Sequence, residues 1–465
     1  MAKAKKPKIS YSCTECSYKT AKWMGKCPEC GSWNTLQEEA PPAQGRRATS
    51  KNVRRVEPQL LNQVDLTSGE VRLSTSIHEL DRVLGGGLVT GALTLIGGDP
   101  GVGKSTLLLT VLSHFARRGL RTLYVSGEES ARQIRLRADR LELATDELYM
   151  LAETDLDAAL AAAERLKPRV LVLDSVQTLH TPELTGVPGA VTQVREVAAR
   201  AMSLSKGFDI PTFLVGHVTK QGGIAGPKVL EHLVDTVVYF EGDGRTQLRV
   251  LRAVKNRFGS TGEIGFFEMT AKGLEEVPDA SARLLQERVA SASGTSVIAA
   301  MEGSRPILAE VQALVGQPTP ATPGRTTLGV DRGRLQMLLA VLGKLGFPLH
   351  DRDVFVSAAG GLKILEPAAD LGIAVSVVGS LRDRAIEKNT MVFGEIGLVG
   401  EIRAVSQPAF RLNEAARHGF RTVIAPHSAV EHAPEGIEVI GVRTLHEALA
   451  KLFGGDNSGG RRERR

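Results

Sequence analysis

One stretch, GGDPGVGKST at residues 97–106, constrains the fold of this chain more than any other feature. It follows the apolar run ALTLIG (92–97) and opens a helical pattern over residues 104–118. From Gly98 to Ser105 it fits G-x-x-x-x-G-K-[ST], whose glycines let backbone N–H groups surround a triphosphate. In this pattern Lys104 reaches the β- and γ-phosphates and Ser105 binds Mg²⁺. The predicted nucleotide contacts are Gly98, Asp99, Pro100, Gly101, Val102, Gly103, Lys104, Ser105 and Thr106.

Short apolar runs alternate with helical patterns along the residues that follow. The runs are RTLYVS (121–126), ELYML (147–151), RVLVLD (169–174) and PTFLVGHV (211–218). Nearly all-apolar strands separated by helices predict a parallel sheet covered on both faces, which is an α/β fold. Residues 235–257 then predict two strands joined by a Gly-Asp-Gly turn, and residues 264–270 predict a further strand. This context favours a phosphate-binding loop over a chance glycine-rich turn.

Acidic residues follow two of the predicted strands. Asp174 ends the run RVLVLD, where a carboxylate can hold the Mg²⁺ shell through water, although a strand-end Asp can also cap a helix. The stretch YVSGEES (124–130) places Glu128 and Glu129 where the sheet faces the γ-phosphate. A carboxylate there can orient the attacking water. We predict that Glu128 is the catalytic acid, with Glu129 as the alternative, since Glu129 also fits an acidic helix start.

All four cysteines lie within residues 13–30, in the pattern C-x2-C-x10-C-x2-C. Two such pairs give four sulfur ligands, so we predict tetrahedral zinc binding rather than disulfides or free buried thiols. The predicted zinc ligands are Cys13, Cys16, Cys27 and Cys30. Both tryptophans of the chain, Trp23 and Trp33, lie in the same module. They either pad this small module, which is the more common outcome, or stack on bases or cap a partner surface.

The basic residues gather at the N-terminus. Residues 1–56 hold 12 Lys and Arg against 4 Asp and Glu, while the rest of the chain holds 46 against 48. This distribution indicates an anionic partner for the N-terminal module, or else a solubilising tail. No apolar run approaches the length of a membrane span, and MAKAKKPKIS lacks the apolar segment of a secretory signal. We therefore expect a cytoplasmic protein.

Two further stretches carry lysines and arginines suited to an anion. The stretch HVTKQGGIAGPKVLEHLVD (217–235) is glycine-rich, and we predict that Lys220 and Lys228 contact DNA there; an ordinary surface loop is the alternative. The stretch AVKNRFGSTGE (253–263) ends a predicted strand with Lys255 and Arg257. This basic pair could meet the protein's own nucleotide, a neighbour's nucleotide or a nucleic acid, and a solvated basic turn is the remaining reading.

These patterns divide the chain into successive parts. We predict a four-cysteine zinc finger at 1–40, a linker at 41–69, an ATPase domain at 70–275 and a joining segment at 276–295. A second domain with mixed strands and helices is predicted at 296–455, with a Pro-rich loop at 314–329 inside it. The last residues, 456–465, are predicted to be disordered.

The chain resembles the bacterial RadA (Sms) family of DNA repair and recombination proteins over nearly its whole length. Behind the four-cysteine finger, the resemblance is carried by STSIHELDRVLGGGLVTGALTLIGGDPGVGKST, YVSGEES, VLVLDSVQT, GHVTKQGGIAGPKVLEHLVD and KNRFG. It implies a RecA-like ATPase core, similar to the replicative helicase DnaB, that forms hexameric rings around DNA. It also implies ATP, Mg²⁺ and Zn²⁺ as cofactors. The implied activity is a motor on single-stranded and branched DNA that extends recombination intermediates and promotes branch migration with RecA.

The resemblance also implies roles for individual residues. His217 matches the position where RecA-like cores place a sensor of the γ-phosphate. Lys255 and Arg257 form the basic pair of KNRFG, and in ring-forming motors that edge meets the next subunit's ATP. We therefore predict that Lys255, and less strongly Arg257, are catalytic cations acting across a subunit interface. A direct contact of Arg257 with DNA stays open as the alternative.

The second domain resembles the proteolytic domain of Lon, an α+β domain. Residues 365–381 match the segment that carries the nucleophilic Ser of Lon, and here that place holds Asp370. Residues 394–420 match the segment with the Lys of Lon, and here that place holds Ala409. A Ser–Lys dyad needs the amine to activate the hydroxyl, so we expect a scaffold rather than a protease. The two functions left are an ATP-driven DNA motor and an ATP-gated DNA-binding scaffold without translocation.

Overall fold

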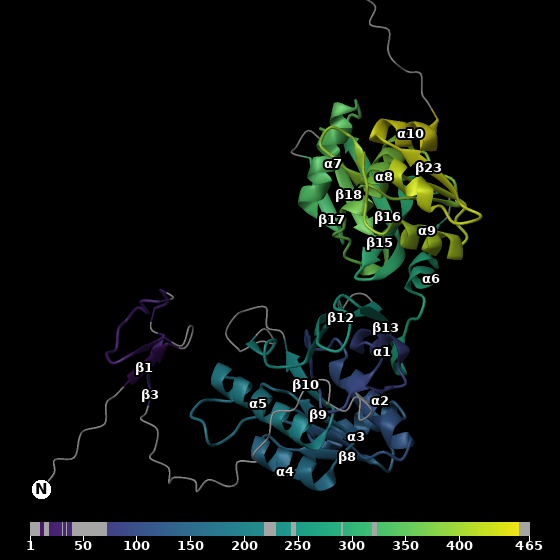
Figure 1. The fold of residues 1–465 in the computed structure, drawn as a ribbon. Helices are drawn as coiled ribbons and strands as arrows, with labels where there is room; N and C mark the ends of the chain where they lie inside the picture. The colour runs from purple at the N-terminus through teal and green to yellow at the C-terminus, as the bar shows by residue number, and fades with distance from the viewer. Residues whose placement is uncertain are drawn as a thin grey trace, which may run out of the picture. The chain divides into compact units, whose positions relative to one another are not determined.

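The computed structural model describes residues 10–13, 18–29, 31–33, 35–39, 72–217, 229–242, 248–289, 292–318 and 323–454. The chain divides into two compact units, residues 1–67 and residues 68–465, which are described separately (Figure 1). The predicted linker at 41–69 and the predicted tail at 456–465 lie outside the described residues. So do four predicted site residues: Cys16, Cys30, Lys220 and Lys228.

The first unit contains a small antiparallel sheet with the strand order β2-β1-β3. Its core is made by Cys13, Cys27 and Leu36, and Tyr11, Tyr18 and Met24 pack against it. The tryptophans do not fill this core, since Trp23 is 57% exposed and Trp33 is 71% exposed. Tyr11 and Tyr18 are the aromatic residues that pack against it. The strands are β1 (Ser10–Cys13), β2 (Lys19–Thr20) and β3 (Leu36–Glu39).

The first sheet of the second unit has nine strands in the order β14-β13-β12-β11-β6-β10-β9-β7-β8. Strands β11, β6, β10, β9, β7 and β8 run parallel, and β12, β13 and β14 add antiparallel strands at one edge, as the sequence predicts. The bounds are β6 (Leu93–Gly98), β7 (Thr122–Ser126), β8 (Leu148–Ala152), β9 (Val170–Asp174), β10 (Thr212–His217), β11 (Thr236–Glu241), β12 (Leu248–Asn256), β13 (Ile264–Thr270) and β14 (Gly273–Glu276).

Helices cover both faces of this sheet, which explains why its central strands are apolar at successive positions. In β9, Val170 and Val172 pack in the core beneath α1, α2 and α3, while Leu171 and Leu173 pack in the core beneath α4 and α5. Successive side chains of a strand point to opposite faces, so a strand covered on both sides is apolar throughout. The helices are α1 (His78–Leu84), α2 (Lys104–Arg117), α3 (Ala131–Arg140), α4 (Leu156–Leu166) and α5 (Val191–Phe208). Strands β4 (Arg72–Leu73) and β5 (Leu88–Val89) pair as a separate two-stranded antiparallel sheet.

A second sheet of seven strands has the order β17-β18-β16-β15-β19-β22-β23 and mixes parallel with antiparallel pairs. Its strands are β15 (Thr295–Glu302), β16 (Arg305–Pro318), β17 (Arg325–Leu328), β18 (Arg352–Ala358), β19 (Thr390–Val392), β22 (Thr422–Pro426) and β23 (Glu438–Val442). The helices of this part are α6 (Ala280–Leu285), α7 (Arg332–Lys344), α8 (Asp370–Arg382), α9 (Pro408–Arg417) and α10 (Leu445–Phe453), and β20 (Glu395–Ile396) pairs with β21 (Ile402–Arg403).

The prediction of a Pro-rich loop at 314–329 is wrong over most of that range. Strand β16 continues to Pro318 and pairs with β18, and β17 occupies 325–328. Pairing with β18, a strand distant in the sequence, supplies hydrogen bonds that the local composition does not reveal. Within the described parts of the chain, no helix has both the length and the apolar character to cross a membrane.

Candidate active site

The phosphate-binding stretch lies where the sequence predicts, between β6, which ends at Gly98, and α2, which begins at Lys104. Two glycines are required by this geometry. A Cβ on Gly98 would lie 2.4 Å from the carbonyl oxygen of Phe240, and Gly103 has a φ of 113° with a Cβ position 2.9 Å from Met269. Neither place admits a side chain without movement of its neighbours. The loop therefore delivers backbone N–H groups and the N-terminus of a 14-residue helix to one point, which suits phosphate.

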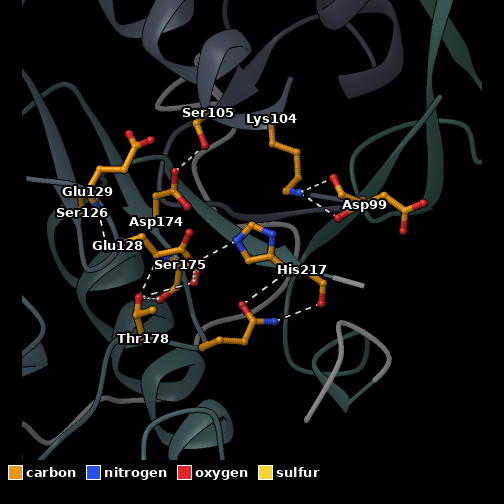
Figure 2. A network of polar contacts seen from close by, with 12 residues as sticks. Asp99, Lys104, Ser105, Ser126, Glu128, Glu129, Asp174, Ser175, Thr178 and His217 are labelled. Carbon is orange, nitrogen blue, oxygen red and sulfur yellow. Dashed lines mark hydrogen bonds and ion pairs between the residues drawn. The ribbon is translucent and has the colours of Figure 1, made fainter. Parts of the chain in front are cut away.

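Lys104 lies within this loop rather than in solvent. Its side chain is buried, and Nζ donates to the carbonyl oxygens of Gly98 at 2.8 Å and Asp99 at 3.0 Å (Figure 2). Burial lowers the pKa of the Lys104 ammonium, and the carboxylates of Asp174 and Glu128 oppose that shift. An ammonium held over the loop by two carbonyls is placed to meet phosphate oxygens, so these residues fit a nucleoside triphosphate.

Ser105 and Asp174 come together from the start of α2 and the end of β9. The Ser105 hydroxyl donates to Asp174 Oδ2 at 2.7 Å. A hydroxyl that donates its proton to a carboxylate keeps its lone pairs free for a cation, so this pair fits the Mg²⁺ position predicted from the sequence. When bound, the metal would neutralise charge on the β- and γ-phosphates.

Tyr124, which the sequence reading treated only as part of an apolar strand, joins the same carboxylate. It lies in β7, is almost fully buried, and its hydroxyl donates to Asp174 Oδ2. Burial and the nearby charge of Asp174 raise the pKa of Tyr124 well above its usual value, so the hydroxyl remains a donor. The pairing of β7 with β9, which sets Ser126 opposite Asp174, brings these side chains together.

Glu128 occupies the position of the predicted catalytic acid. Its Oε1 accepts a hydrogen bond from Ser175 Oγ at 2.6 Å and lies 3.0 Å from His217 Nε2 (Figure 2). The hydrogen bond with His217 is the main cause that lowers the pKa of the Glu128 carboxyl. One ligand atom each from Glu128, Asp174 and His217 lies within 4.8 Å of the others. Three residues predicted from separate motifs thus meet beside the phosphate-binding loop.

Glu129, the alternative to Glu128, is directed elsewhere. It forms an ion pair with Arg137 on α3, and Figure 2 shows its carboxylate pointing away from His217. Of the two carboxylates, Glu128 is the one that lies with Asp174 and His217. Gln177, which sequence reasoning also missed, bonds the backbone of His217 through its carboxamide at 3.2 and 3.4 Å. It holds in place the last residue before 218–228, a segment outside the described residues.

The basic turn KNRFG lies at the other end of the sheet from the phosphate-binding loop. In the parallel pair of β6 and β11, Gly98 is opposite Phe240 while Thr94 is opposite Thr236. In the antiparallel pair of β11 and β12, Thr236 is opposite Asn256. The turn after Asn256 therefore lies beyond the start of β6, whereas the phosphate-binding loop follows its end.

The two cations of this turn have different surroundings. Lys255 Nζ donates to the carbonyl oxygens of Glu231 at 2.7 Å and Val234 at 2.8 Å. Desolvation, and then the charge of Arg257, lower the pKa of Lys255. Arg257 is 52% exposed and pairs with the buried carboxylate of Asp235 at 3.0 Å. Arg257 is thus the more accessible of the two.

The turn is tightly packed. Gly259 approaches Gly85 so closely that a Cβ on Gly259 would lie 3.0 Å from the Cα of Gly85. Asn256 Oδ1 accepts from the backbone N–H of Phe258 at 2.9 Å, and the Arg72 guanidinium donates to the carbonyls of both Gly85 and Phe258. The glycine of KNRFG is explained by this contact between two backbones.

Three family models match parts of the chain. An AAA domain matches residues 59–223, a rubredoxin metal binding domain matches residues 11–38, and subunit ChlI of Mg-chelatase matches residues 323–429. Full-length relatives also match. DNA repair protein RadA of Halalkalibacterium halodurans is 48% identical over 455 residues, covering 97% of this chain and 99% of that protein.

The proteins of the same name from Bacillus subtilis and Pseudomonas aeruginosa are 47% and 49% identical, each covering 97% of this chain and 100% of the relative. This chain belongs to the RadA family of bacterial DNA repair proteins. Membership confirms the predicted fold class: an α/β P-loop ATPase core between a zinc ribbon and a ChlI- or Lon-like region. It also confirms ATP hydrolysis as the activity of the core and DNA repair as its setting.

The zinc ribbon of this RadA family member is consistent with the matched metal-binding domain. Cys13 and Cys27 are buried. The N–H of Cys13 bonds the carbonyl of Tyr18, and the N–H of Cys27 bonds that of Ser32, both at 2.9 Å. Two buried thiols, in the cysteine spacing of a four-sulfur site, fit zinc. The second cysteine of each pair lies outside the described residues.

The Lon-like region places Asp370 in an ion pair. Asp370 begins α8, is buried, and accepts Arg334 Nε on Oδ1 at 2.7 Å and the Ile396 N–H on Oδ2 at 3.0 Å. Ala409 lies in the first turn of α9. Neither position offers a hydroxyl nucleophile or an amine, and the carboxylate of Asp370 is occupied by structural contacts.

Proposed function

We propose that this protein is a DNA-dependent ATPase that works as a ring-shaped motor in recombinational repair. It would act as a hexameric homo-oligomer on single-stranded and branched DNA. In partnership with RecA it would extend recombination intermediates or promote branch migration. Family membership supplies the setting of DNA repair and ATP hydrolysis, and the geometry of the core supports the finer steps.

The register of the first sheet carries this proposal. It places Lys255 level with Leu95, three residues before Gly98, and Arg257 after the end of β12 at Asn256. At about 3.3 Å a residue, the backbone of Lys255 lies about 10 Å short of the level of Gly98 along the strands, and β12 is two strands away from β6. Neither cation is therefore placed to serve the nucleotide of its own subunit. A neighbouring subunit's nucleotide is the anion that fits, and hydrolysis would then depend on assembly.

Each residue of the site has a defined part in this proposal. Lys104 and the loop amides bind the phosphates, and Ser105 and Asp174 hold the metal position. Glu128 orients the attacking water and accepts its proton, while His217 and Ser175 hold the carboxylate. His217 directly precedes residues 218–228, so DNA bound through Lys220 and Lys228 would be coupled to the position of Glu128.

The Lon-like region is assigned a role in assembly and DNA contact rather than in proteolysis. Asp370 and Ala409 stand where a Ser–Lys dyad would be needed, and Asp370 is committed to Arg334. Without an amine to activate a hydroxyl, peptide hydrolysis is not expected.

The first experiment measures steady-state ATP hydrolysis with and without single-stranded DNA. We expect DNA to stimulate the wild type and Lys255→Ala to lose that stimulation. Mixing Lys255→Ala with Lys104→Ala should restore part of it, because a mixed ring contains sites with an intact loop and a neighbour's intact Lys255. An arginine finger acting in trans is worth about 10³–10⁵-fold in rate, so a large effect is expected if the role is of this kind.

Lys255 also bonds two carbonyls, so its loss could act through folding. Thermal unfolding is therefore measured for Lys255→Ala and Arg257→Ala, each as an unmixed sample. An unchanged unfolding temperature with lost stimulation shows that the variant affects catalysis rather than folding. If ATP hydrolysis is independent of DNA and Lys255→Ala leaves its rate unchanged, the proposed role of Lys255 at a neighbouring subunit's nucleotide is wrong. Failure of the mixed sample to recover activity would argue for a role within one subunit.

The alternative function is an ATP-gated scaffold that binds DNA without moving along it. Unwinding of forked DNA distinguishes the two. For a motor, Lys104→Ala should abolish unwinding while leaving the fold intact, since the hydrogen bonds of Lys104 Nζ within the described residues go to the loop carbonyls of Gly98 and Asp99. Wild-type protein that hydrolyses ATP on forked DNA without separating strands would favour the scaffold. Unwinding that persists in Lys104→Ala would contradict the motor.

A further inference from the structure

The two tryptophans of the zinc ribbon form an exposed aromatic surface. Trp23 is 57% exposed and Trp33 is 71% exposed, although large aromatic side chains normally bury most of their area. Trp23 is held by a hydrogen bond from its Nε1 to the carbonyl of Leu36 at 3.1 Å. The core of the module is filled by other residues, so neither ring is needed as padding.

The two rings flank one glycine. A Cβ added to Gly25 would lie 3.8 Å from Trp33 and 3.9 Å from Trp23, in contact with both. Gly25 is not among the glycines with positive φ, so the backbone does not require glycine there. Both indole rings therefore lie next to the backbone at Gly25, close enough together to form one aromatic surface.

Two lysines accompany these tryptophans: Lys22 precedes Trp23 in the chain, and Lys26 lies beside Trp33. Lys26 pairs its backbone with that of Trp33, and its Nζ lies 5.7 Å from the centre of the Trp33 ring. Lys22 and Lys26 are both exposed, while Glu29 is the exposed acid nearest in sequence. Across residues 1–56 there are 12 Lys and Arg against 4 Asp and Glu. Exposed aromatic rings beside cations are how proteins hold single-stranded nucleic acid without reading its sequence.

We propose that Trp23 and Trp33 form a base-stacking surface for single-stranded DNA, with Lys22 and Lys26 attracting the backbone. This contact would be separate from any contact in the ATPase core and goes beyond the proposed motor function. It would give the zinc ribbon its own hold on the strand. A protein surface is the competing occupant, because exposed tryptophan is also enriched at protein interfaces. The excess of cations favours DNA.

The chain itself supplies the probe, because Trp23 and Trp33 are its only tryptophans. Full-length, zinc-loaded protein is titrated with a dT oligonucleotide of about 16 nucleotides, a length that a single-strand site can cover. The control is an abasic strand of the same length and charge. We expect saturable quenching of tryptophan emission by dT and much weaker quenching by the abasic strand.

The matched variants are Trp33→Ala and Tyr149→Ala, the second altering an exposed aromatic residue on β8 in the ATPase core. Loss of one stacked base should weaken dT binding by about 5- to 150-fold in Trp33→Ala, and Tyr149→Ala should bind as the wild type does. Binding of the abasic strand should be the same in both. Zinc content and circular dichroism check that Trp33→Ala is folded, and the wild-type titration tests the proposal without any variant.

Three results would overturn the proposal. The first is dT binding, followed by anisotropy of a labelled strand, with no change in tryptophan emission. The second is equal quenching by dT and by the abasic strand, which would mean attraction by charge alone. The third is quenching only by a recombinase filament, which would make this a protein surface. DNA-stimulated ATP hydrolysis is measured in the same samples, so that failure of this surface is distinguished from failure of the motor.

Discussion

Glu128→Gln is expected to bind ATP and to lose its hydrolysis, with kcat falling by about 10²–10⁴-fold, the usual contribution of a general base. The carboxamide keeps the shape of the side chain and can still meet Ser175 and His217, so the loop and the metal position should be unchanged. It cannot accept the proton of the attacking water. Phosphate release under saturating ATP measures the loss, and equilibrium binding of ATP checks that the site remains formed.

The matched control is Glu129→Gln, one residue along the chain. Glu129 pairs with Arg137 and lies outside the cluster of Glu128, Asp174 and His217, so its rate should stay within a few-fold of wild type. The reverse result, with Glu129→Gln inactive and Glu128→Gln active, would show that the nucleotide-bound site uses the other carboxylate. Equal loss in both would point to disruption of the turn that carries them.

The pKa of Glu128 gives this site a direction of pH dependence. His217 holds the pKa of the Glu128 carboxyl below that of an ordinary glutamate. A depressed folded-state pKa stabilises the fold above the unfolded value of about 4.3, and this contribution is lost as the pH falls through the folded value. The carboxylate is therefore in its base form throughout the neutral range, and its protonation should not limit hydrolysis there.

Arg411→Ala is expected to destabilise the C-terminal region by about 3–5 kcal/mol, the range for removing one partner of a buried ion pair. Arg411 is completely buried in α9, and it donates to the carbonyl of Ala299 at 2.6 Å and to both carboxylate oxygens of Glu366. Its removal leaves the Glu366 carboxylate without its cation and opens a cavity beside Phe393, over whose ring the guanidinium lies.

Hydrogen exchange of the amides in β15 measures this loss locally, since a chain of several domains does not unfold in one step. The control is Arg417→Ala on the same helix, where the side chain is 59% exposed and pairs with Asp279. That surface pair should contribute only about 0.2–1 kcal/mol. Exchange in Arg411→Ala as slow as in wild type would mean that neighbouring groups or water replace the guanidinium.

The sequence alone was enough for every feature that depends on neighbouring residues in the chain. The strand, glycine-rich turn and helix around residues 97–106 form one continuous segment, so the motif predicts both the site and its local fold. The same holds for the five apolar runs, which differ from the observed strands by at most one residue at each end. The cysteine spacing likewise predicted the metal-binding character of residues 11–38.

Only the tertiary structure decided which side chains meet. The pairing of β7 with β9 brings Tyr124 to Asp174, and the position of His217 at the end of β10 distinguishes Glu128 from Glu129. The pairing of β11 with β6 and β12 places KNRFG away from the phosphate-binding loop. The exposure of the two tryptophans and the burial of Arg411 were likewise visible only in the tertiary structure. A local pattern specifies the backbone of a segment. Strand register and packing, by contrast, bring together residues that are far apart in the sequence. These contacts set the position, charge state and exposure of each functional side chain.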